Sequence, residues 1–183
     1  MFKYYISTFL IAAIVSFLLT PLIRRISLFM GWLDYPSWRK MNKKPMPLMG
    51  GLAIYIGFAI SLLFVIFKEP FRMNLHRFLG LLAGSFIIVL VGFVDDVKGL
   101  SARRKLFYQI VASAIVVFMG YVIFKVTNPF GQSFSIPAFV GFALSIFWIV
   151  GFTNAVNLMD GLDGLAAGVS TIIAASLFFA GVR

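Results

Sequence analysis

The chain reads Asn-Ala-Val-Asn-Leu-Met-Asp-Gly-Leu-Asp-Gly from Asn154 to Gly164, a polar stretch between two long apolar runs (138–156 and 165–182). This alternation of apolar and polar segments is typical of membrane-spanning helices that meet at a membrane surface. Two of the six acidic residues in the chain lie in this stretch, and two more, Asp95 and Asp96, follow an earlier apolar run. Acidic side chains beside membrane segments are costly, so both clusters are candidate functional sites.

The composition places the chain among membrane proteins. Its 183 residues are 61% hydrophobic and 12% charged, whereas soluble domains carry about 25% charged residues. The net charge of +10 does not indicate nucleic-acid binding, because Lys and Arg are confined to short gaps between apolar runs and form no continuous basic face. The absence of cysteine excludes disulfides, thiolate metal sites and a cysteine nucleophile.

The hydropathy pattern predicts an all-α, polytopic membrane protein with about six transmembrane helices in a single domain, residues 1–183. Six apolar runs are close to the roughly 20 residues that a spanning helix needs. They cover residues 5–23, 48–67, 78–94, 106–124, 138–156 and 165–182. The first run is a retained helix and not a signal peptide, because no small-residue cleavage site follows it and Arg24 and Arg25 flank it.

Small and polar residues within the runs indicate helix–helix contacts. Gly80 and Gly84 are four residues apart, as are Gly164 and Gly168. Such spacing favours close approach of helices in a membrane. Gln109 is the strongly polar side chain of the fourth run, and we expect it to form an interhelical hydrogen bond.

The distribution of positive charge predicts the orientation. The gaps after the first, third and fifth runs carry ten Lys and Arg residues, and the other side carries six. The positive-inside rule then places the N-terminus outside and the first set in the cytoplasm of a cell-membrane protein. Asp95, Asp96 and the stretch from Asn154 to Gly164 consequently share the cytoplasmic face, and they share one face in either orientation.

The positions of Asp95 and Asp96 do not stabilise the helix that carries them. They lie at the C-terminal end of a helix, where the helix dipole favours cations, and they repel each other. Mg²⁺ would remove both objections, since it is bound by one or two carboxylates together with substrate phosphates. Lys98 and the basic residues at 103–105 supply the positive field that phosphates need. A solvated helix end is the alternative interpretation.

The second cluster has a three-residue spacing: Asn154, Asn157, Asp160 and Asp163. Each step of three turns a helical side chain by about 60°, so the four cannot share one narrow face. Gly161 and Gly164 weaken the helix, which predicts a tightened or broken turn between the fifth and sixth helices. The result is an oxygen-rich pocket at the membrane surface, with a purely structural hydrogen-bonded turn as the alternative.

These motifs together resemble a known family. The pattern Asn154-x-x-Asn157-x-x-Asp160-Gly161-x-Asp163-Gly164-Leu165, preceded by Asp95-Asp96 and by Pro45-x-Pro47-x-x-Gly50-Gly51, is similar to the polyprenyl-phosphate N-acetylhexosamine-1-phosphate transferases (glycosyltransferase family 4). This family includes enzymes that start teichoic-acid and O-antigen glycans and phospho-N-acetylmuramoyl-pentapeptide transferase. The stretch at 152–157 is closer to the branch that uses UDP-N-acetylglucosamine.

The resemblance implies a reaction and its partners. A polyprenyl phosphate, undecaprenyl phosphate in particular, attacks the β-phosphate of a UDP-amino sugar and gives a lipid-diphosphate-sugar and UMP. This is the first membrane step of cell-wall or surface glycan assembly. The resemblance also implies a magnesium cofactor, with manganese as an alternative, a lipid bilayer as surroundings and a homodimer as an option.

The resemblance also assigns roles to residues. Asp95 and Asp96 are the catalytic pair and the metal ligands, and Asp95 either acts as a base on the lipid phosphate or only orients the metal site. The substrate-binding residues are Asn154, Asn157, Asp160, Asp163, Lys98 and Lys44, with the two lysines on the phosphates.

The sequence departs from the family in several places. Asn42 and Leu48 stand where the family often has His and Arg. Family members are also longer and carry a further Asp and a histidine-rich segment, whereas no acidic residue follows Asp163 and no histidine follows His76. We therefore expect the N-terminal part of a longer fold, inactive alone or in need of a second polypeptide. A cation-binding or cation-transporting membrane protein and a non-catalytic fragment are the alternative functions.

Overall fold

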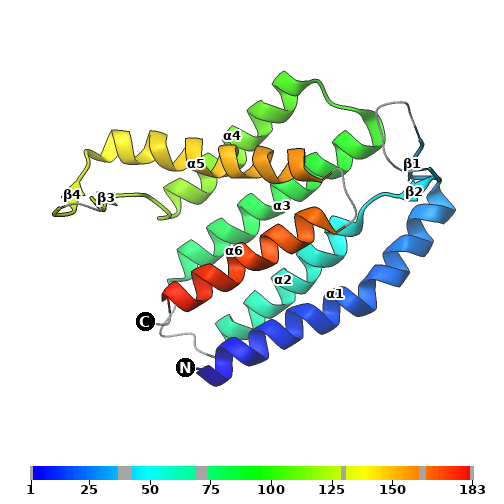
Figure 1. Ribbon diagram of the computed structural model, residues 1–183, viewed down its shortest axis with the longest axis horizontal. Coiled ribbons are helices and arrows are strands. Elements are labelled where there is room, and N and C mark those ends of the chain that lie inside the picture. Colours follow the sequence, from blue (N-terminus) through cyan, green and yellow to red (C-terminus); the bar gives the residue numbers. More distant parts are fainter. Residues whose placement is uncertain (1, 37–42, 69–73, 129–130, 161–163, 182–183) are drawn as a thin grey trace.

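The computed structural model describes residues 2–36, 43–68, 74–128, 131–160 and 164–181, and these residues form a helical bundle (Figure 1). The helices are α1 (Phe2–Met30), α2 (Gly50–Lys68), α3 (Leu75–Lys98), α4 (Ala102–Phe118), α5 (Ala138–Met159) and α6 (Leu165–Gly181). Two short antiparallel hairpins join β1 (Leu33–Asp34) to β2 (Met46–Pro47), and β3 (Lys125–Val126) to β4 (Phe134–Ser135). The predicted all-α class is confirmed.

Six helices form where the apolar runs predicted them, so the chain is a multi-pass membrane protein. Within the described ranges, α1, α2, α3 and α5 are long and apolar enough to cross a membrane. The other two helices, α4 and α6, have 17 residues each. At 1.5 Å per residue they measure about 26 Å, slightly less than the roughly 30 Å hydrocarbon core.

Two predicted boundaries were wrong. The fourth run was expected at 106–124, but α4 begins at Ala102 and ends at Phe118. Basic residues 103–105 join its first turn because Lys and Arg are good helix formers, and the chain leaves the helix at Gly120, whose φ is 108°. The first loop was expected to begin at Arg24, but α1 continues to Met30, so Arg24 lies on the helix.

Neighbouring helices pack through small residues. A Cβ atom on Gly84 would collide with the side chain of Val116, and one on Gly80 would collide with Met119. The predicted close contact at this glycine pair, between α3 and α4, is confirmed. Within the described residues the prediction for Gly164 and Gly168 was wrong, because a Cβ at either would meet none of their atoms within 4 Å.

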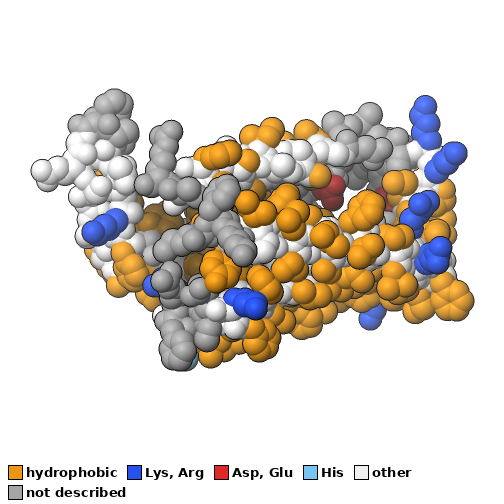
Figure 2. All heavy atoms as spheres, turned by 90° about the horizontal axis from the view of Figure 1, so that it is seen from below, with side chains coloured by type: hydrophobic (Ala, Val, Ile, Leu, Met, Phe, Trp, Pro, Cys, Tyr) orange, Lys and Arg blue, Asp and Glu red, His pale blue; other side chains and the backbone are white. Residues whose placement is uncertain are grey.

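The surface matches a membrane environment. Figure 2 shows hydrophobic side chains over most of the visible surface, while Lys and Arg gather toward the end that holds the β1–β2 hairpin. The described interior includes small and polar side chains, with Ala53, Ala112, Ser113 and Gln109 each at most 3% exposed. Helix interfaces made of small residues, with large apolar side chains on the outer surface, are expected when lipid surrounds the helices in place of water.

Candidate functional site

Both acidic clusters lie at the same end of the molecule. α3 ends at Lys98, α4 begins at Ala102 and α5 ends at Met159, and the β1–β2 hairpin lies at this end too (Figure 1). Patches of acidic side chain are visible here beside the basic ones (Figure 2). The prediction that the paired aspartates and the Asn154–Gly164 stretch share one face is confirmed for the described residues.

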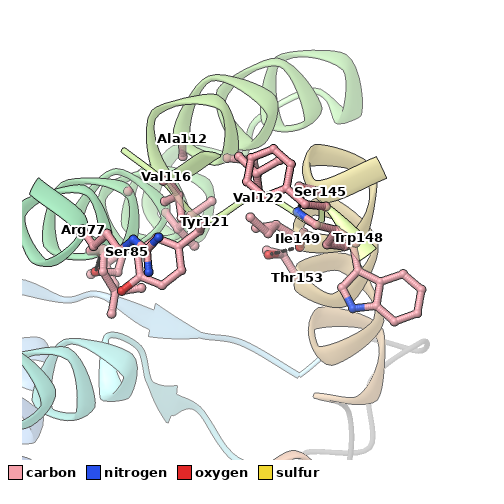
Figure 3. A pocket seen from close by; sticks show the side chains of 18 residues that line it. Arg77, Ser85, Ala112, Val116, Tyr121, Val122, Ser145, Trp148, Ile149 and Thr153 are labelled. Carbon is pink, nitrogen blue, oxygen red and sulfur yellow. Dashed lines mark hydrogen bonds between the residues drawn. The ribbon is translucent and has the colours of Figure 1, made fainter. Parts of the chain in front are cut away.

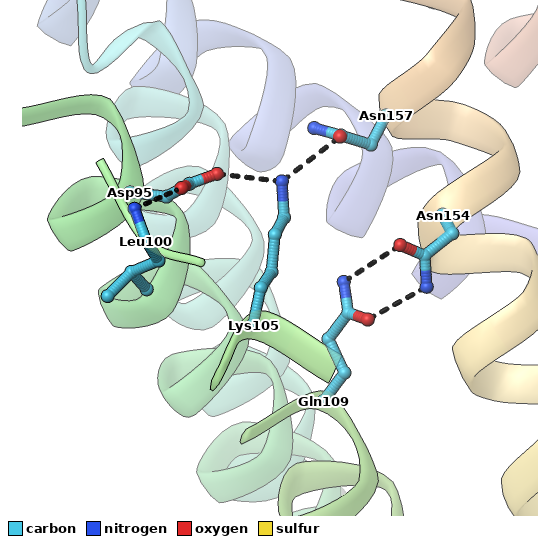
Figure 4. Close-up of polar contacts among 6 residues, drawn as sticks. All are labelled: Asp95, Leu100, Lys105, Gln109, Asn154 and Asn157. Atoms are coloured by element: carbon cyan, nitrogen blue, oxygen red, sulfur yellow. Dashed lines mark hydrogen bonds and ion pairs between the residues drawn. The ribbon is translucent and has the colours of Figure 1, made fainter. Parts of the chain in front are cut away.

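Lys105 connects the two clusters. Its Nζ donates hydrogen bonds to Asp95 Oδ2 at 2.8 Å and to Asn157 Oδ1 at 3.1 Å (Figure 4). The other oxygen of Asp95 accepts a hydrogen bond from the Leu100 backbone N–H at 2.9 Å. The side chains of Lys105 and Asp95 are 20% and 23% exposed, so their ion pair is partly shielded from solvent and stronger than a surface pair.

A second polar contact joins the same two helices one turn further along. Asn154 Nδ2 donates to Gln109 Oε1 at 2.8 Å, and Gln109 Nε2 donates to Asn154 Oδ1 at 3.4 Å (Figure 4). Asn154 Nδ2 also donates to the Val150 carbonyl at 2.8 Å. The interhelical hydrogen bond expected of Gln109 is therefore confirmed. Because Gln109 follows Lys105 by four residues, the two contacts stack and fix α4 against α5.

Asp96 differs from its neighbour. Consecutive helical residues point about 100° apart, and Asp96 points toward α2 and lines a cavity there. It is exposed and makes no hydrogen bond or ion pair with the described part of the chain. Asp34 and Asp160 add negative charge around it. Trp32 packs edge-on against Phe93, with ring centroids 5.1 Å apart, which holds the β1 strand near this end of α3.

The remaining predicted site residues are less fully placed. Asp160 is exposed and follows the last residue of α5. Lys98 is exposed and makes no ion pair with the described residues, and Lys44 is exposed just before β2. Asp163 lies outside the described residues. Asn157 lies on regular helix, since α5 continues to Met159, and the predicted turn falls largely on residues 161–163, which lie outside the described residues.

Sequence reasoning missed two residues of this site. Asp34 was overlooked because it stands alone in a basic loop, although helix parity places that loop on the same face. Lys105 was grouped with Arg103 and Arg104 as a general positive field. Its position four residues before Gln109 was the signal that it faces α5.

The acidic residues suit Mg²⁺ only in part. Carboxylates are ligands that Mg²⁺ accepts, and Mg²⁺ commonly uses one or two of them together with phosphate oxygens. No group of three or more His, Cys, Asp or Glu side chains in the described ranges is arranged to hold a metal. Both oxygens of Asp95 already accept hydrogen bonds, whereas those of Asp96 accept none from the part of the chain that the structure describes, so Asp96 fits a metal better than Asp95.

Two cavities adjoin these helices. The larger, about 790 Å³, lies between α3, α4 and α5 (Figure 3), and its charged lining residue is Arg77 near the start of α3. It reaches Thr153, the residue before Asn154. The smaller, about 340 Å³, lies between α2 and α3 and reaches Asp96.

Comparison with known proteins agrees with this arrangement. Residues 78–183 match the model of glycosyl transferase family 4. A protein of Bacillus subtilis (strain 168), described as "Probable undecaprenyl-phosphate N-acetylglucosaminyl 1-phosphate transferase", is 38% identical over 164 residues, which cover 90% of this chain and 44% of that protein.

Two further relatives carry related names. The decaprenyl-phosphate N-acetylglucosaminephosphotransferase of Mycolicibacterium smegmatis is 33% identical over 92% of this chain and 43% of its own length. The phospho-N-acetylmuramoyl-pentapeptide-transferase of Lactobacillus gasseri is 35% identical over 89% of this chain and 56% of its own length. The chain thus spans about half the length of the curated relatives that it matches.

Proposed function

Because this chain belongs to glycosyl transferase family 4, we propose that it transfers N-acetylglucosamine-1-phosphate from UDP-N-acetylglucosamine to undecaprenyl phosphate. The products are a lipid-diphosphate-sugar and UMP, and the reaction is the first membrane step of a cell-wall or surface glycan. The names of the B. subtilis and M. smegmatis relatives support an N-acetylglucosamine donor and a polyprenyl phosphate acceptor.

The observation that carries the proposal is the position of Lys105. One ammonium group lies between Asp95 and Asn157, which come from the two separate motifs. A site that joins two anionic phosphates needs a cation at the point where the substrates meet. The contact therefore supports one shared transfer site and not two independent polar loops.

The bond changes are simple. An oxygen of the lipid phosphate forms a bond to the β-phosphorus of the UDP-sugar. The bond from that phosphorus to the bridging oxygen breaks, and UMP leaves with the oxygen and its electron pair. The attacking phosphate is already anionic near neutral pH, so the main barrier is repulsion between anions, which Lys105 and the basic residues around the site reduce.

The two aspartates take different roles in this proposal. Asp95 accepts hydrogen bonds at both oxygens, which supports the orienting role: it holds Lys105 in place. Asp96 would hold Mg²⁺, with Mn²⁺ as an alternative. The metal, when bound, supplies positive charge to the phosphate oxygens.

The other site residues bind substrates in the same proposal. Asn157, Asp160 and Asp163 contact the nucleotide-sugar, and Lys98 and Lys44 contact phosphates. Asn154 supports this wall of the site, since its amide is held by Gln109. An alanine variant of each residue should raise the KM for UDP-N-acetylglucosamine or for the lipid. A variant that leaves both KM values unchanged would show that the residue does not bind substrate.

We also propose that the site faces the cytoplasm from the cell membrane, with the N-terminus outside. The excess of Lys and Arg at the site end supports this orientation. The chain has no cysteine, so single cysteines at Lys98 and Lys125 report the topology directly. Impermeant maleimide should label position 125, and not position 98, in intact cells. Light scattering of the purified protein tests the homodimer that the family resemblance allows.

A transfer assay tests the function itself. Membranes that contain the product of the complete reading frame to which this chain belongs receive radiolabelled UDP-N-acetylglucosamine, undecaprenyl phosphate and Mg²⁺, and the label in extracted lipid is counted. We expect label in lipid with the unaltered protein and its loss in Asp95→Asn and Asp160→Asn. A Lys125→Gln variant, altered in the hairpin at the other end of the molecule, is the matched control. Absence of lipid label from the unaltered protein contradicts the proposal.

A further inference from the structure

Gln109 is a buried amide on α4, one turn after Lys105, and its side chain is 3% exposed. Its partner is Asn154 of α5, whose Nδ2 donates to Gln109 Oε1 at 2.8 Å while Gln109 Nε2 donates back to Asn154 Oδ1 at 3.4 Å (Figure 4). Asn154 Nδ2 has a second acceptor in the Val150 carbonyl. Both N–H groups of Asn154 are thereby used, which leaves this amide a single orientation.

The amide pair and the Lys105–Asn157 contact are two neighbouring links between α4 and α5. As the chain advances along α4 from Lys105 to Gln109, the partner on α5 moves back from Asn157 to Asn154. The two links lie about 6 Å apart along α4 and about 4.5 Å apart along α5. Two links this close together fix the rotation of α5 about its axis and its position along α4.

The buried link is the stronger constraint of the two. Asn157 is exposed, so water competes for its bond to Lys105. Gln109 is shielded from water, and breaking its pair would leave polar atoms with no water to replace the lost bonds. The amide pair is therefore retained while the exposed contact can open. The orientation of Asn157 consequently depends on the pair one turn away.

That orientation matters because Lys105 offers only donors. An ammonium group cannot accept a hydrogen bond, so the atom of Asn157 that faces it is Oδ1. Asn157 Nδ2 makes no hydrogen bond within the described part of the chain, and the side chain extends from α5 toward Asp95 (Figure 4). Lys105 and Asn157 thus both present N–H donors on this side of the site, which suits phosphate or carbonyl oxygens.

We propose that Gln109 is a positioning residue of the transfer site. By holding Asn154 it sets the rotation of α5, so that Asn157 turns its oxygen to Lys105 and its N–H groups to the nucleotide-sugar. This inference rests on the proposed transfer reaction and adds to it a residue that acts through its neighbours. Without the amide pair, Asn157 rotates and Lys105 loses one of the two side-chain oxygens that hold it.

The test compares the amide pair with an equally buried link elsewhere on α5. Gln109→Leu removes the pair, and Ser145→Ala is the matched control. Ser145 is also 3% exposed, and its hydroxyl accepts a hydrogen bond from the Ile123 N–H at 2.9 Å, which ties α5 to the segment after α4. Ser145 lies about 18 Å along the helix from Asn157, so its loss weakens packing without reaching the site.

Initial rates are measured in membranes that contain the product of the complete reading frame, per amount of folded protein. We expect Gln109→Leu to lower kcat/KM for UDP-N-acetylglucosamine by about 10- to 100-fold, because a small displacement of a substrate-positioning group causes such losses. The lipid KM should stay within about twofold, and Ser145→Ala should change both values by less than about twofold. Exchange of the two amides, Gln109→Asn with Asn154→Gln, should recover most of the loss, whereas Gln109→Asn alone should not.

A second measurement needs no turnover. Acetic anhydride acetylates the lysines of the same purified product without substrates, and peptide mass spectrometry follows Lys105 with Lys125 as the internal reference. We expect Lys105 to react about 2- to 10-fold faster in Gln109→Leu, as for the loss of one hydrogen bond, and at its unaltered rate in Ser145→Ala. Gln109→Asn repeats both measurements if the leucine variant does not fold.

Three results overturn the positioning role: unchanged Lys105 acetylation in Gln109→Leu, equal losses of kcat/KM in Gln109→Leu and Ser145→Ala, or no recovery in the folded exchange variant. The proposed reaction fails separately. If the unaltered protein transfers no sugar-phosphate but Gln109→Leu still speeds acetylation of Lys105, the reaction is lost and the hold of Gln109 on Lys105 and Asn157 stands. If Gln109→Leu transfers sugar-phosphate at the unaltered rate, the reaction stands and the positioning role is lost.

Discussion

At the scale of single residues, Lys105 is the side chain that joins the two motifs. Among the described residues, removing its charge leaves Asp95 paired with the Leu100 backbone N–H. In the proposed reaction it also withdraws a cation from between the two substrate phosphates. We expect Lys105→Gln to lower the transfer rate by about 100- to 1,000-fold, as for other groups that stabilise developing charge. Lys105→Arg should retain more activity. Initial rates at saturating substrates measure the effect, and a rate near that of the unaltered protein would refute this role.

Variants of Asp95 and of Asp96 should differ in how their transfer rates depend on the Mg²⁺ concentration. Asp95 has both oxygens occupied by hydrogen bonds, whereas Asp96 has neither occupied within the described structure. We expect Asp96→Asn to raise the Mg²⁺ concentration for half-maximal rate by about tenfold or more. Asp95→Asn should lower the rate at every Mg²⁺ concentration with little change in that midpoint. Identical midpoints for the two variants would show that the roles are not divided in this way.

The proximity of Asp95 and Asn157 could be predicted from the sequence, but the contact between them could not. Helix parity places both at the same membrane face regardless of side-chain detail. Which of three consecutive basic residues reaches across depends on where α4 begins, and the helix starts four residues before the apolar run does. Gln109 was predictable because a lone amide in an apolar helix needs a partner.

At the scale of helices, the Gln109–Asn154 pair and the close contact at Gly84 should determine how α3, α4 and α5 pack around the site. The Gln109–Asn154 amide pair fixes α4 against α5 one turn from Lys105. We expect Gln109→Leu to lower the free energy of unfolding by about 1–3 kcal/mol, since it leaves the half-buried amide of Asn154 with fewer partners. Thermal or denaturant unfolding in detergent measures it.

A double-mutant cycle with Asn154→Leu gives the coupling, which we expect at about 0.5–2 kcal/mol. Ser176→Ala is a control, because its hydroxyl donates to the Ile172 carbonyl within α6 and makes no hydrogen bond to another described helix. A coupling of zero would mean that the amide pair does not hold the helices together.

Gly84 controls the contact between α3 and α4. A side chain there collides with Val116 and approaches the Ala112 carbonyl, so Gly84→Val should destabilise the fold by about 1–3 kcal/mol. A second change, Val116→Ala, should recover part of the loss because it removes the colliding methyl groups. Gly168→Val, where nothing lies within 4 Å, is the matched control. Equal melting temperatures for the two valine variants would contradict this packing.

The helices could be predicted from hydropathy because each apolar run is long enough to define one element. The hairpins could not, since each strand has two residues and carries no periodic pattern. The β1–β2 hairpin matters for the site, because it brings Asp34 near Asp96. The distribution of Lys and Arg predicted only that the segment between α1 and α2 lies at the same membrane face as the paired aspartates.

At the scale of the whole molecule, the charges argue for chemistry at a membrane surface. Asp95, Asp96 and Asp160 lie near helix ends, and Lys105 lies in the first turn of α4. A cation transporter would be expected to place such groups near the middle of its spans. The position of these groups at one end of the bundle instead supports the proposed enzyme, which acts on a lipid headgroup at the membrane surface.

The central claim is that one site breaks the bond between the two phosphates of a UDP-sugar and passes the β-phosphate to a lipid. UDP-N-acetylglucosamine labelled with ³²P in either the α- or the β-position, supplied with undecaprenyl phosphate and the purified product of the complete reading frame, tests it directly. We predict that β-label enters the lipid and that α-label is recovered as UMP, with both lost in Lys105→Gln. Label from the α-position in the lipid, or no lipid label from either position, would contradict the account.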